Sequence, residues 1–257
     1  MVKSPIFPAA VLCAVALPLL AQKPAAPAAG EKPATPAAGD AQPTPPPAPA
    51  IKPLGGPRYE LSGITFNEDT RAIHLPALVN MTEGLLEYAL VHEAGKVHES
   101  FLSTVVSPYD LNVVLLLLSY QPASTFFDVS DKKAGAVLVK NPKIASAARI
   151  TVTLEWKNPD GKTQSAPLES LLLNVDQKAT VTAGSFTYTG SFLMEDGIFM
   201  ARETGSILAL YADAAALINN PRQGNENDDI WLPDKSKVPP KATPVSVIIT
   251  PFQPVAK

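Results

Sequence analysis

The stretch that decides the fold, residues 149–157, reads RITVTLEWK. Apolar side chains at Ile150, Val152 and Leu154 alternate with polar ones, and this strict alternation predicts a β-strand with one face in a core and the other in solvent. Residues 158–161, NPDG, follow as a turn, because Pro presets one backbone dihedral angle and Gly permits a positive φ. The chain then returns as a second strand over residues 162–165.

The same patterns predict further strands on both sides of this hairpin. The clearest is a second hairpin in which residues 85–92 and 97–105 are strands and residues 93–96 are the turn. Other strands are predicted over residues 59–66, 71–78, 185–193, 198–202, 206–211 and 243–250.

Helices are predicted at three places. Residues 107–118 combine Ser107 as N-cap, Pro108 in the first turn and Asp110 at the positive end of the helix dipole with an almost wholly apolar run that must be buried. Shorter helices are predicted over residues 167–174 and 213–218, the second capped by Asp213. The pattern as a whole predicts an α+β fold, with a mainly antiparallel sheet and two or three packed helices.

The N-terminus has the layout of a signal peptide. Lys3 precedes an uncharged, mostly apolar run that ends near residue 21, and Pro8 and Pro18 interrupt it, which disfavours a spanning helix. We therefore expect residues 1–21 to be cleaved and the protein to be exported, to the periplasm or outside the cell. Cleavage would remove the only cysteine, Cys13, and with it disulfide, thiolate–metal and cysteine-nucleophile chemistry.

The rest of the chain divides into a linker and a domain. Residues 22–57 are rich in Pro and Ala and are expected to form a disordered tether, since they carry too little apolar surface to fold. Residues 58–257 hold 17 Lys and Arg against 22 Asp and Glu, a formal charge of 17 − 22 = −5. An acidic domain of this size disfavours nucleic acid as a partner. Membrane contact is expected only through an uncleaved signal segment.

Several stretches of the domain form a recognisable set. Its members are LPALVNM at 75–81, GLLEY at 84–88, GKVHES at 95–100, GSILAL at 205–210, Asp213, NNP at 219–221, Trp231, and the closing PP at 239–240 and TPV at 243–245. Together they resemble the YdjY-domain family of exported bacterial proteins over nearly all of residues 58–257. The resemblance implies no activity. Some members are labelled ferredoxin-like, but a cysteine-free mature chain argues against an iron–sulfur cluster, and we expect no cofactor.

The candidate functional surface lies on the second predicted hairpin. It comprises Lys96, His98, Glu99 and Ser100, together with Glu87, which the hairpin register places diagonally opposite His98, and Asn80 from the first matching stretch. Tyr211 and Trp231 are interpreted as core or loop anchors.

Three functions are compatible with these residues. The leading hypothesis is a binding or structural module rather than an enzyme, which recognises an envelope protein or cell-surface component around His98. The second is a metal-binding protein or metal-dependent enzyme that uses His98 and Glu99 as ligands. The third is a hydrolase with Ser100, His98 and Glu87 as its catalytic residues. In a purely structural interpretation, His98 and Glu99 only fix the hairpin.

Overall fold

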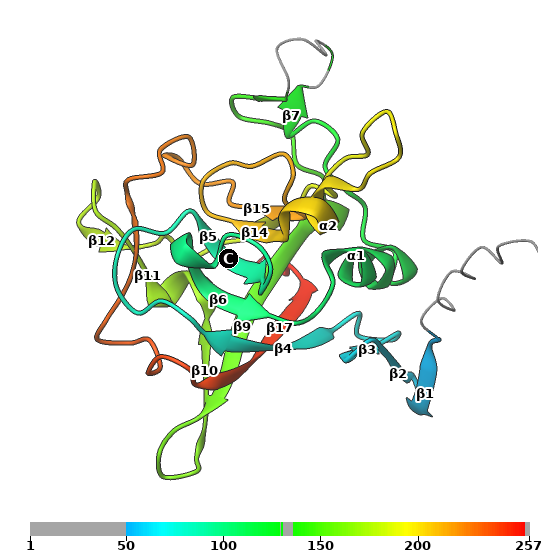
Figure 1. The fold of residues 1–257 in the computed structure, drawn as a ribbon, viewed down its shortest axis with the longest axis horizontal. Coiled ribbons are helices and arrows are strands. Elements are labelled where there is room, and N and C mark those ends of the chain that lie inside the picture. The colour runs from blue at the N-terminus through cyan, green and yellow to red at the C-terminus, as the bar shows by residue number, and fades with distance from the viewer. Residues whose placement is uncertain (1–49, 129, 131–135, 255–257) are drawn as a thin grey trace, which may run out of the picture. The chain divides into compact units, whose positions relative to one another are not determined.

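The computed structural model describes residues 50–128, 130 and 136–254 (Figure 1). The predicted signal segment and nearly all of the linker therefore lie outside the described residues. Within the described ranges, 37% of residues are in strands and 13% are helical. No helix in these ranges is long and apolar enough to cross a membrane. The fold is mostly β, and the predicted α+β class is wrong.

Eight strands of the described chain close into a barrel. The ring closes because β6 pairs with β5 on one side and with β4 on the other. Closure leaves no unpaired barrel edge within the described residues. In order around the ring, the strands are β4 (Ile73–Val79), β17 (Pro244–Pro251), β9 (Arg149–Lys157), β13 (Phe186–Tyr188), β15 (Ile218–Asn219), β14 (Ser206–Ala209), β5 (Tyr88–His92) and β6 (Ser100–Thr104).

Strand β9 confirms the alternation that the sequence predicted. Ile150, Val152 and Leu154 are completely buried in the main core, and the residues between them face outward. β17 pairs antiparallel with β9 and contributes Val247 and Ile249 to the same core. The barrel interior is therefore filled by the apolar face of each strand, as in other small closed barrels.

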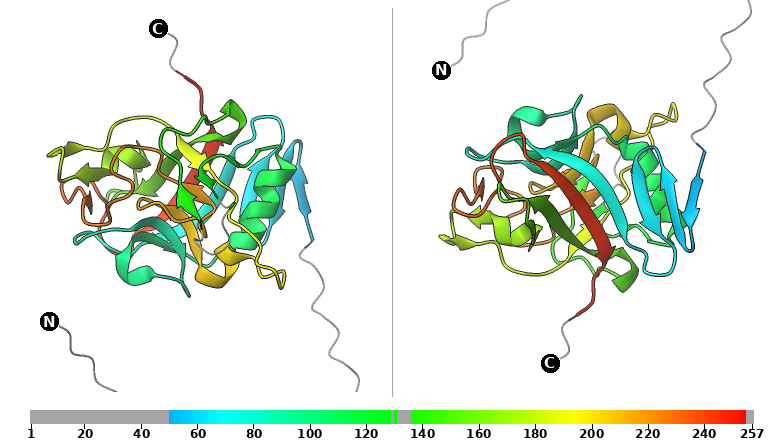
Figure 2. Two further views of the ribbon diagram at one scale, coloured as in Figure 1. Left: turned by 90° about the horizontal axis from the view of Figure 1, so that it is seen from above. Right: turned by 90° about the horizontal axis from the view of Figure 1, so that it is seen from below.

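The other strands extend this barrel (Figures 1 and 2). Three of them continue the sheet beyond β4 as a wing, formed by β1 (Lys52–Gly55), β2 (Arg58–Leu61) and β3 (Ile64–Asn67). β10 (Thr163–Pro167) pairs with β9 and forms the predicted NPDG hairpin. Two small sheets lie outside the barrel: β12 (Ala179–Thr180), β11 (Leu172–Asn174) and β16 (Trp231–Pro233) form one, and β7 (Phe127–Asp128) and β8 (Val137–Leu138) form the other.

The two α-helices of the described chain are short and form no layer. α1 (Pro108–Leu117) begins and ends close to where the sequence placed it. α2 (Met200–Thr204) occupies a segment that was predicted as a strand. The predicted helix at 167–174 is a 3₁₀ turn, η3 (Leu168–Leu171), followed by β11, and the one at 213–218 is a set of turns. Another 3₁₀ turn, η2 (Ser146–Ala148), leads into β9.

The predicted hairpin of residues 85–105 is also wrong. β5 and β6 run parallel, with Tyr88 opposite Ser100 and His92 opposite Thr104. The chain between them turns at residues 93–96 and passes through the 3₁₀ turn η1 (Val97–Glu99), which returns it to the start of β5. The antiparallel register that placed Glu87, His98 and Ser100 on one face therefore does not exist.

Candidate functional site

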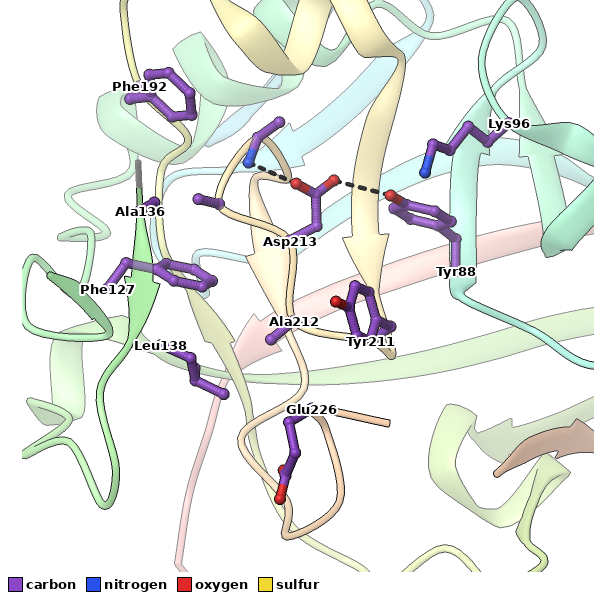
Figure 3. A pocket seen from close by; sticks show the side chains of 12 residues that line it. Tyr88, Lys96, Phe127, Ala136, Leu138, Phe192, Tyr211, Ala212, Asp213 and Glu226 are labelled. Carbon is purple, nitrogen blue, oxygen red and sulfur yellow. Dashed lines mark hydrogen bonds between the residues drawn. The ribbon is translucent and has the colours of Figure 1, made fainter. Parts of the chain in front are cut away.

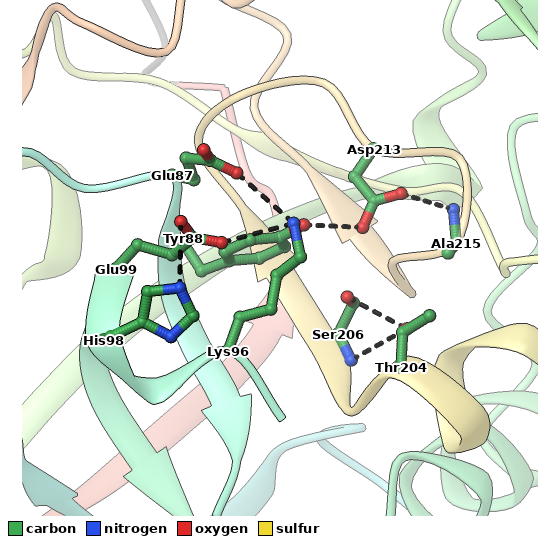
Figure 4. Close-up of polar contacts among 9 residues, drawn as sticks. All are labelled: Glu87, Tyr88, Lys96, His98, Glu99, Thr204, Ser206, Asp213 and Ala215. Carbon is green, nitrogen blue, oxygen red and sulfur yellow. Dashed lines mark hydrogen bonds and ion pairs between the residues drawn. The ribbon is translucent and has the colours of Figure 1, made fainter. Parts of the chain in front are cut away.

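The return of the chain through η1 brings Lys96 back to the beginning of β5. The Lys96 Nζ lies 3.2 Å from Glu99 Oε1, 3.5 Å from Glu87 Oε2 and 5.1 Å from the centroid of the Tyr88 ring (Figure 4). Burial alone would lower the pKa of Lys96, but the contacts with Tyr88 and Glu99 outweigh burial and raise it. Lys96 is therefore a fixed positive charge held between two carboxylates.

Two glycines make this placement of Lys96 sterically possible. Gly205 ends α2 in the left-handed conformation, with φ of 74°. A Cβ built on Gly205 would lie 2.8 Å from the Gly95 Cα, and one built on Gly95 would lie 2.8 Å from the Thr204 carbonyl oxygen. The two backbones therefore approach each other more closely than a side chain at either position would permit. This contact holds the turn before Lys96 against the α2–β14 junction.

Tyr88 connects Lys96 to a second polar centre. The Tyr88 hydroxyl donates a hydrogen bond of 2.9 Å to Asp213 Oδ2, and the backbone N–H of Ala215 donates one of 2.8 Å to Asp213 Oδ1 (Figures 3 and 4). Desolvation on burial, with the charge of Asp213, raises the pKa of Tyr88 to about 12. At neutral pH, Tyr88 is therefore a neutral hydrogen-bond donor.

Asn219 fixes the loop that carries Asp213. The Asn219 side chain accepts a hydrogen bond from the Asp213 N–H and donates one to the Asp213 carbonyl, each 2.9 Å long. Its Nδ2 also donates to Thr189 Oγ1 at 2.9 Å. Asn219 is completely buried. The Asp213 carboxylate is thus positioned by a rigid, fully bonded support, as functional side chains usually are.

A pocket of about 450 Å³ opens above these groups. Tyr88, Lys96 and Asp213 line it together with Glu226, and Figure 3 shows that these polar groups come from separate segments of the chain. Aromatic and aliphatic side chains also line the pocket, among them Phe127 of β7, Leu138 of β8, Phe192 and Tyr211. Apolar walls with a few fixed polar groups are typical of small-molecule binding sites.

The pocket is an acidic one. Asp213 and Glu226 line it, and Glu87 and Glu99 lie at its edge on either side of Lys96. Burial and the charge of Glu99 raise the pKa of Glu87, while Lys96 acts in the opposite direction. Among the described residues, these four carboxylates outnumber Lys96, which favours a ligand group that donates hydrogen bonds or carries positive charge.

The structure brings some of the predicted site residues together and separates others. Lys96, Glu99 and Glu87 form the cluster at the pocket edge, and His98 Nε2 lies 3.6 Å from Glu99 Oε2 with its side chain 78% exposed. Ser100 is completely buried, and its hydroxyl donates to the Leu102 carbonyl at 2.8 Å.

Asn80 has a structural position. Its Nδ2 donates to the carbonyls of Val97 and Ser100 and so ties the η1 turn to the residue after β4. Among the histidines, His74 is exposed on β4, and the Ala94 N–H donates to His92 Nδ1 at 3.2 Å. No three His, Cys, Asp or Glu side chains in the described part of the chain are grouped so that they could hold a metal ion.

Sequence reasoning missed most of the pocket. Tyr88 and Phe127 were not singled out, Tyr211 was interpreted as an anchor, and Asp213 was interpreted as a helix cap. One signal was present: Asp213 is the sole charged residue between the apolar run that ends at Leu210 and the one that begins at Ala214. A single carboxylate in such a position requires a partner.

Comparison with known proteins identifies one family. The family model of the YdjY domain matches residues 64–250, well over half of the chain, which confirms the resemblance in the sequence. No curated protein and no solved structure matches the chain.

Proposed function

Since the chain belongs to the YdjY-domain family, we propose that it is an exported binding module whose pocket at Tyr88 and Asp213 binds part of an envelope component. The observation that carries this proposal is the Tyr88–Asp213 hydrogen bond at the base of a pocket with aromatic walls. The signal-like sequence of residues 1–21 supports export to the periplasm or the cell exterior. The proposed binding site is thus the pocket beside Lys96, whereas the sequence alone favoured the surface around the exposed His98.

The electrostatics of Tyr88 favour binding over catalysis. A tyrosine that serves as a general base or nucleophile needs a pKa lowered toward neutrality. The pKa of Tyr88 is raised to about 12 instead, chiefly by burial. Tyr88 therefore keeps its proton and donates a hydrogen bond to Asp213, which suits a group that shapes and orients a binding site.

The pocket also defines a class of ligand. Phe127, Phe192 and Tyr211 offer aromatic surface, and Asp213 and Glu226 offer negative charge. This combination favours a ligand group with an apolar body and an amine or another hydrogen-bond donor, because aromatic faces and carboxylates both attract cations. An envelope component that exposes such a group is the proposed partner.

The two alternative functions have less support. The hydrolase hypothesis requires the hydroxyl of Ser100 beside His98, but this hydroxyl is buried and bonded to Leu102. The metal hypothesis requires further ligands near His98 and Glu99, and the described residues supply no group of three donors.

A pair of matched probes tests the proposal. Phenethylamine and 3-phenylpropionate share an aromatic ring and differ in the sign of their charge. We expect phenethylamine to shift the amide NMR signals of the chain around Asp213 and 3-phenylpropionate to leave them unchanged. Glu226→Gln, which changes an exposed lining residue, should weaken phenethylamine binding severalfold, and Asp213→Asn should abolish it.

The control is Asp160→Asn, which changes an exposed acid in the NPDG turn and should leave binding as it is. The proposal is wrong if neither probe binds, if both bind equally, or if the Glu226 and Asp213 variants bind like the unaltered chain. Turnover of an ester or peptide by the purified chain would contradict the non-catalytic part of the proposal.

A further inference from the structure

Helix α1 has an apolar face that the described residues leave uncovered. Its inner face buries Leu111, Val114 and Leu115, and only Asp110 and Asn112 are polar along its length. Tyr109, Leu116 and Leu117 point outward and are between 47% and 51% exposed. A helix that is apolar all round is normally buried on all sides.

A loop beside α1 continues this apolar face. The Tyr109 and Phe199 rings meet edge to face with centroids 6.0 Å apart, and Leu193 pairs with Phe199 across a β-bridge. Paired residues of such a bridge point to the same side, so Leu193 lies next to the ring that touches α1. Leu193, Met194 and Ile198 are between 41% and 66% exposed. Figures 1 and 2 show this loop beside α1.

We name the six residues on these two elements the α1 surface: Tyr109, Leu116, Leu117, Leu193, Met194 and Ile198. On an ordinary protein surface, exposed apolar residues are scattered singly. Here six large, half-exposed apolar side chains are grouped on two neighbouring elements. A contiguous patch of this kind marks an interaction site.

The charge of the same segments indicates the partner. Apart from Glu195, which has an interaction of its own, residues 108–117 and 192–204 contain three acids, Asp110, Asp196 and Glu203, against one basic residue, Arg202, a formal charge of 1 − 3 = −2. A second copy of the chain would bring these acids together, and an anionic lipid surface would repel them. A partner with an apolar stripe and basic residues around it complements both the apolar side chains and the negative charge of these segments.

We propose that the α1 surface docks a basic amphipathic segment of another protein. An amphipathic helix that lays its apolar stripe on an apolar face, with Lys or Arg at the rim, is a common form of peptide recognition. This binding site is separate from the Tyr88 pocket, so substitutions at different residues test the two proposals.

Two synthetic peptides test the docking proposal with the full chain. One is a fluorescein-labelled amphipathic 14-mer of Leu and Lys, and the other carries Glu at every Lys position. We expect the Lys peptide to bind at least about tenfold more tightly than the Glu peptide, and its affinity to fall with added salt, because charge discriminates between them. The double variant Leu193→Asn, Met194→Asn should lose at least about tenfold in affinity for the Lys peptide.

The matched control is Val175→Asn, which changes an exposed apolar residue in the turn after β11 and should bind the Lys peptide normally. Because both residues of the double variant are exposed, circular dichroism should show an unchanged fold. Equal binding of the two peptides, or normal binding by the double variant, overturns the proposal. So does sedimentation of the chain as a dimer that the double variant loses, or binding of the chain to phosphatidylglycerol vesicles that the double variant loses, because the occupant would then be a second copy or a membrane.

Discussion

Tyr88 is the residue on which the candidate site depends. It is 2% exposed, it begins strand β5, and its hydroxyl reaches a carboxylate from a loop more than a hundred residues later in the chain. Its ring also lies beneath the Lys96 ammonium. One side chain therefore joins the barrel, the η1 turn and the Asp213 loop.

Removal of the Tyr88 hydroxyl should destabilise the fold. Tyr88→Phe leaves the packing intact and leaves Asp213 Oδ2 without its tyrosine donor, so we expect a loss of about 1–3 kcal/mol in the free energy of unfolding. Urea denaturation measures this loss. Tyr211→Phe is the control, because Tyr211 lines the same pocket and no hydrogen bond of its hydroxyl is seen in the described part of the chain. Equal stability of the two variants would show that the Tyr88–Asp213 bond contributes nothing.

The residues of the site were only partly predictable from sequence. Lys96, Glu99 and Glu87 were singled out and do lie together, but Glu87 was included because of a hairpin register that does not form. Asp213 reaches Tyr88 across 125 positions of sequence, and no local pattern encodes such a contact.

Among the elements, those governed by local periodicity were the predictable ones. β9, β10, β17 and α1 lie where alternation, turn residues and capping residues placed them. The predictions failed at 85–105 and 198–202, where tertiary contacts determine the structure, and the helices predicted at 167–174 and 213–218 do not form either. The contact between Gly95 and Gly205 turns the chain back toward β5, and a single turn of helix precedes Gly205.

The same pair of glycines leads to a prediction about the stability of the fold. Gly205→Ala introduces both an unfavourable positive φ and a clash with the Gly95 backbone. Gly63→Ala is the matched control, since Gly63 also has a positive φ, of 83°, but nothing lies within 4 Å of its Cβ position. We expect Gly205→Ala to lower the free energy of unfolding by at least about 1 kcal/mol more than Gly63→Ala does. Equal losses in thermal or urea denaturation would mean that the close approach is unimportant.

For the whole molecule, the decisive feature is closure of the barrel. Its apolar residues follow a period of two, and the sequence revealed that period. β4, β17, β9 and β13 pair antiparallel, but the predicted α+β sheet with packed helices is wrong because the sheet closes into a barrel. Closure, by contrast, depends on β6 pairing with β4 and, in parallel, with β5. A parallel pair has no turn signature, so the sequence alone favoured an open sheet with helices.

Three buried tyrosines should make the fold sensitive to alkali. Burial raises the pKa of Tyr88 and of Tyr188 to about 12 and raises that of Tyr120 as well, from an ordinary value of 10.0. Each tyrosine with a raised pKa contributes its full stabilisation below about pH 10, the pKa in the unfolded chain. As the pH rises from there toward the folded-state pKa, this contribution falls by about 1.4 kcal/mol per pH unit for each tyrosine. We expect stability to fall steeply between about pH 10 and 12.

Absorbance near 295 nm, which reports tyrosinate, and circular dichroism measured on the same samples check this prediction. The ionisation of these tyrosines should coincide with loss of the β-sheet signal, and the fall in stability should be shallower for Tyr88→Phe. Ionisation of every tyrosine at pH 12 with an unchanged circular dichroism spectrum would contradict the prediction.

The position of β17 has a consequence for how the chain folds. Strand β17 follows every other described strand in sequence, yet it lies between β4 and β9 and pairs with both along most of its length. Until residues 244–251 have been synthesised, β4 and β9 have no shared neighbour and the barrel wall has a gap. The barrel wall therefore cannot close before nearly the whole domain has been synthesised. If the chain is exported, as proposed above, this order of strands would keep the barrel open while the chain passes through a secretion channel.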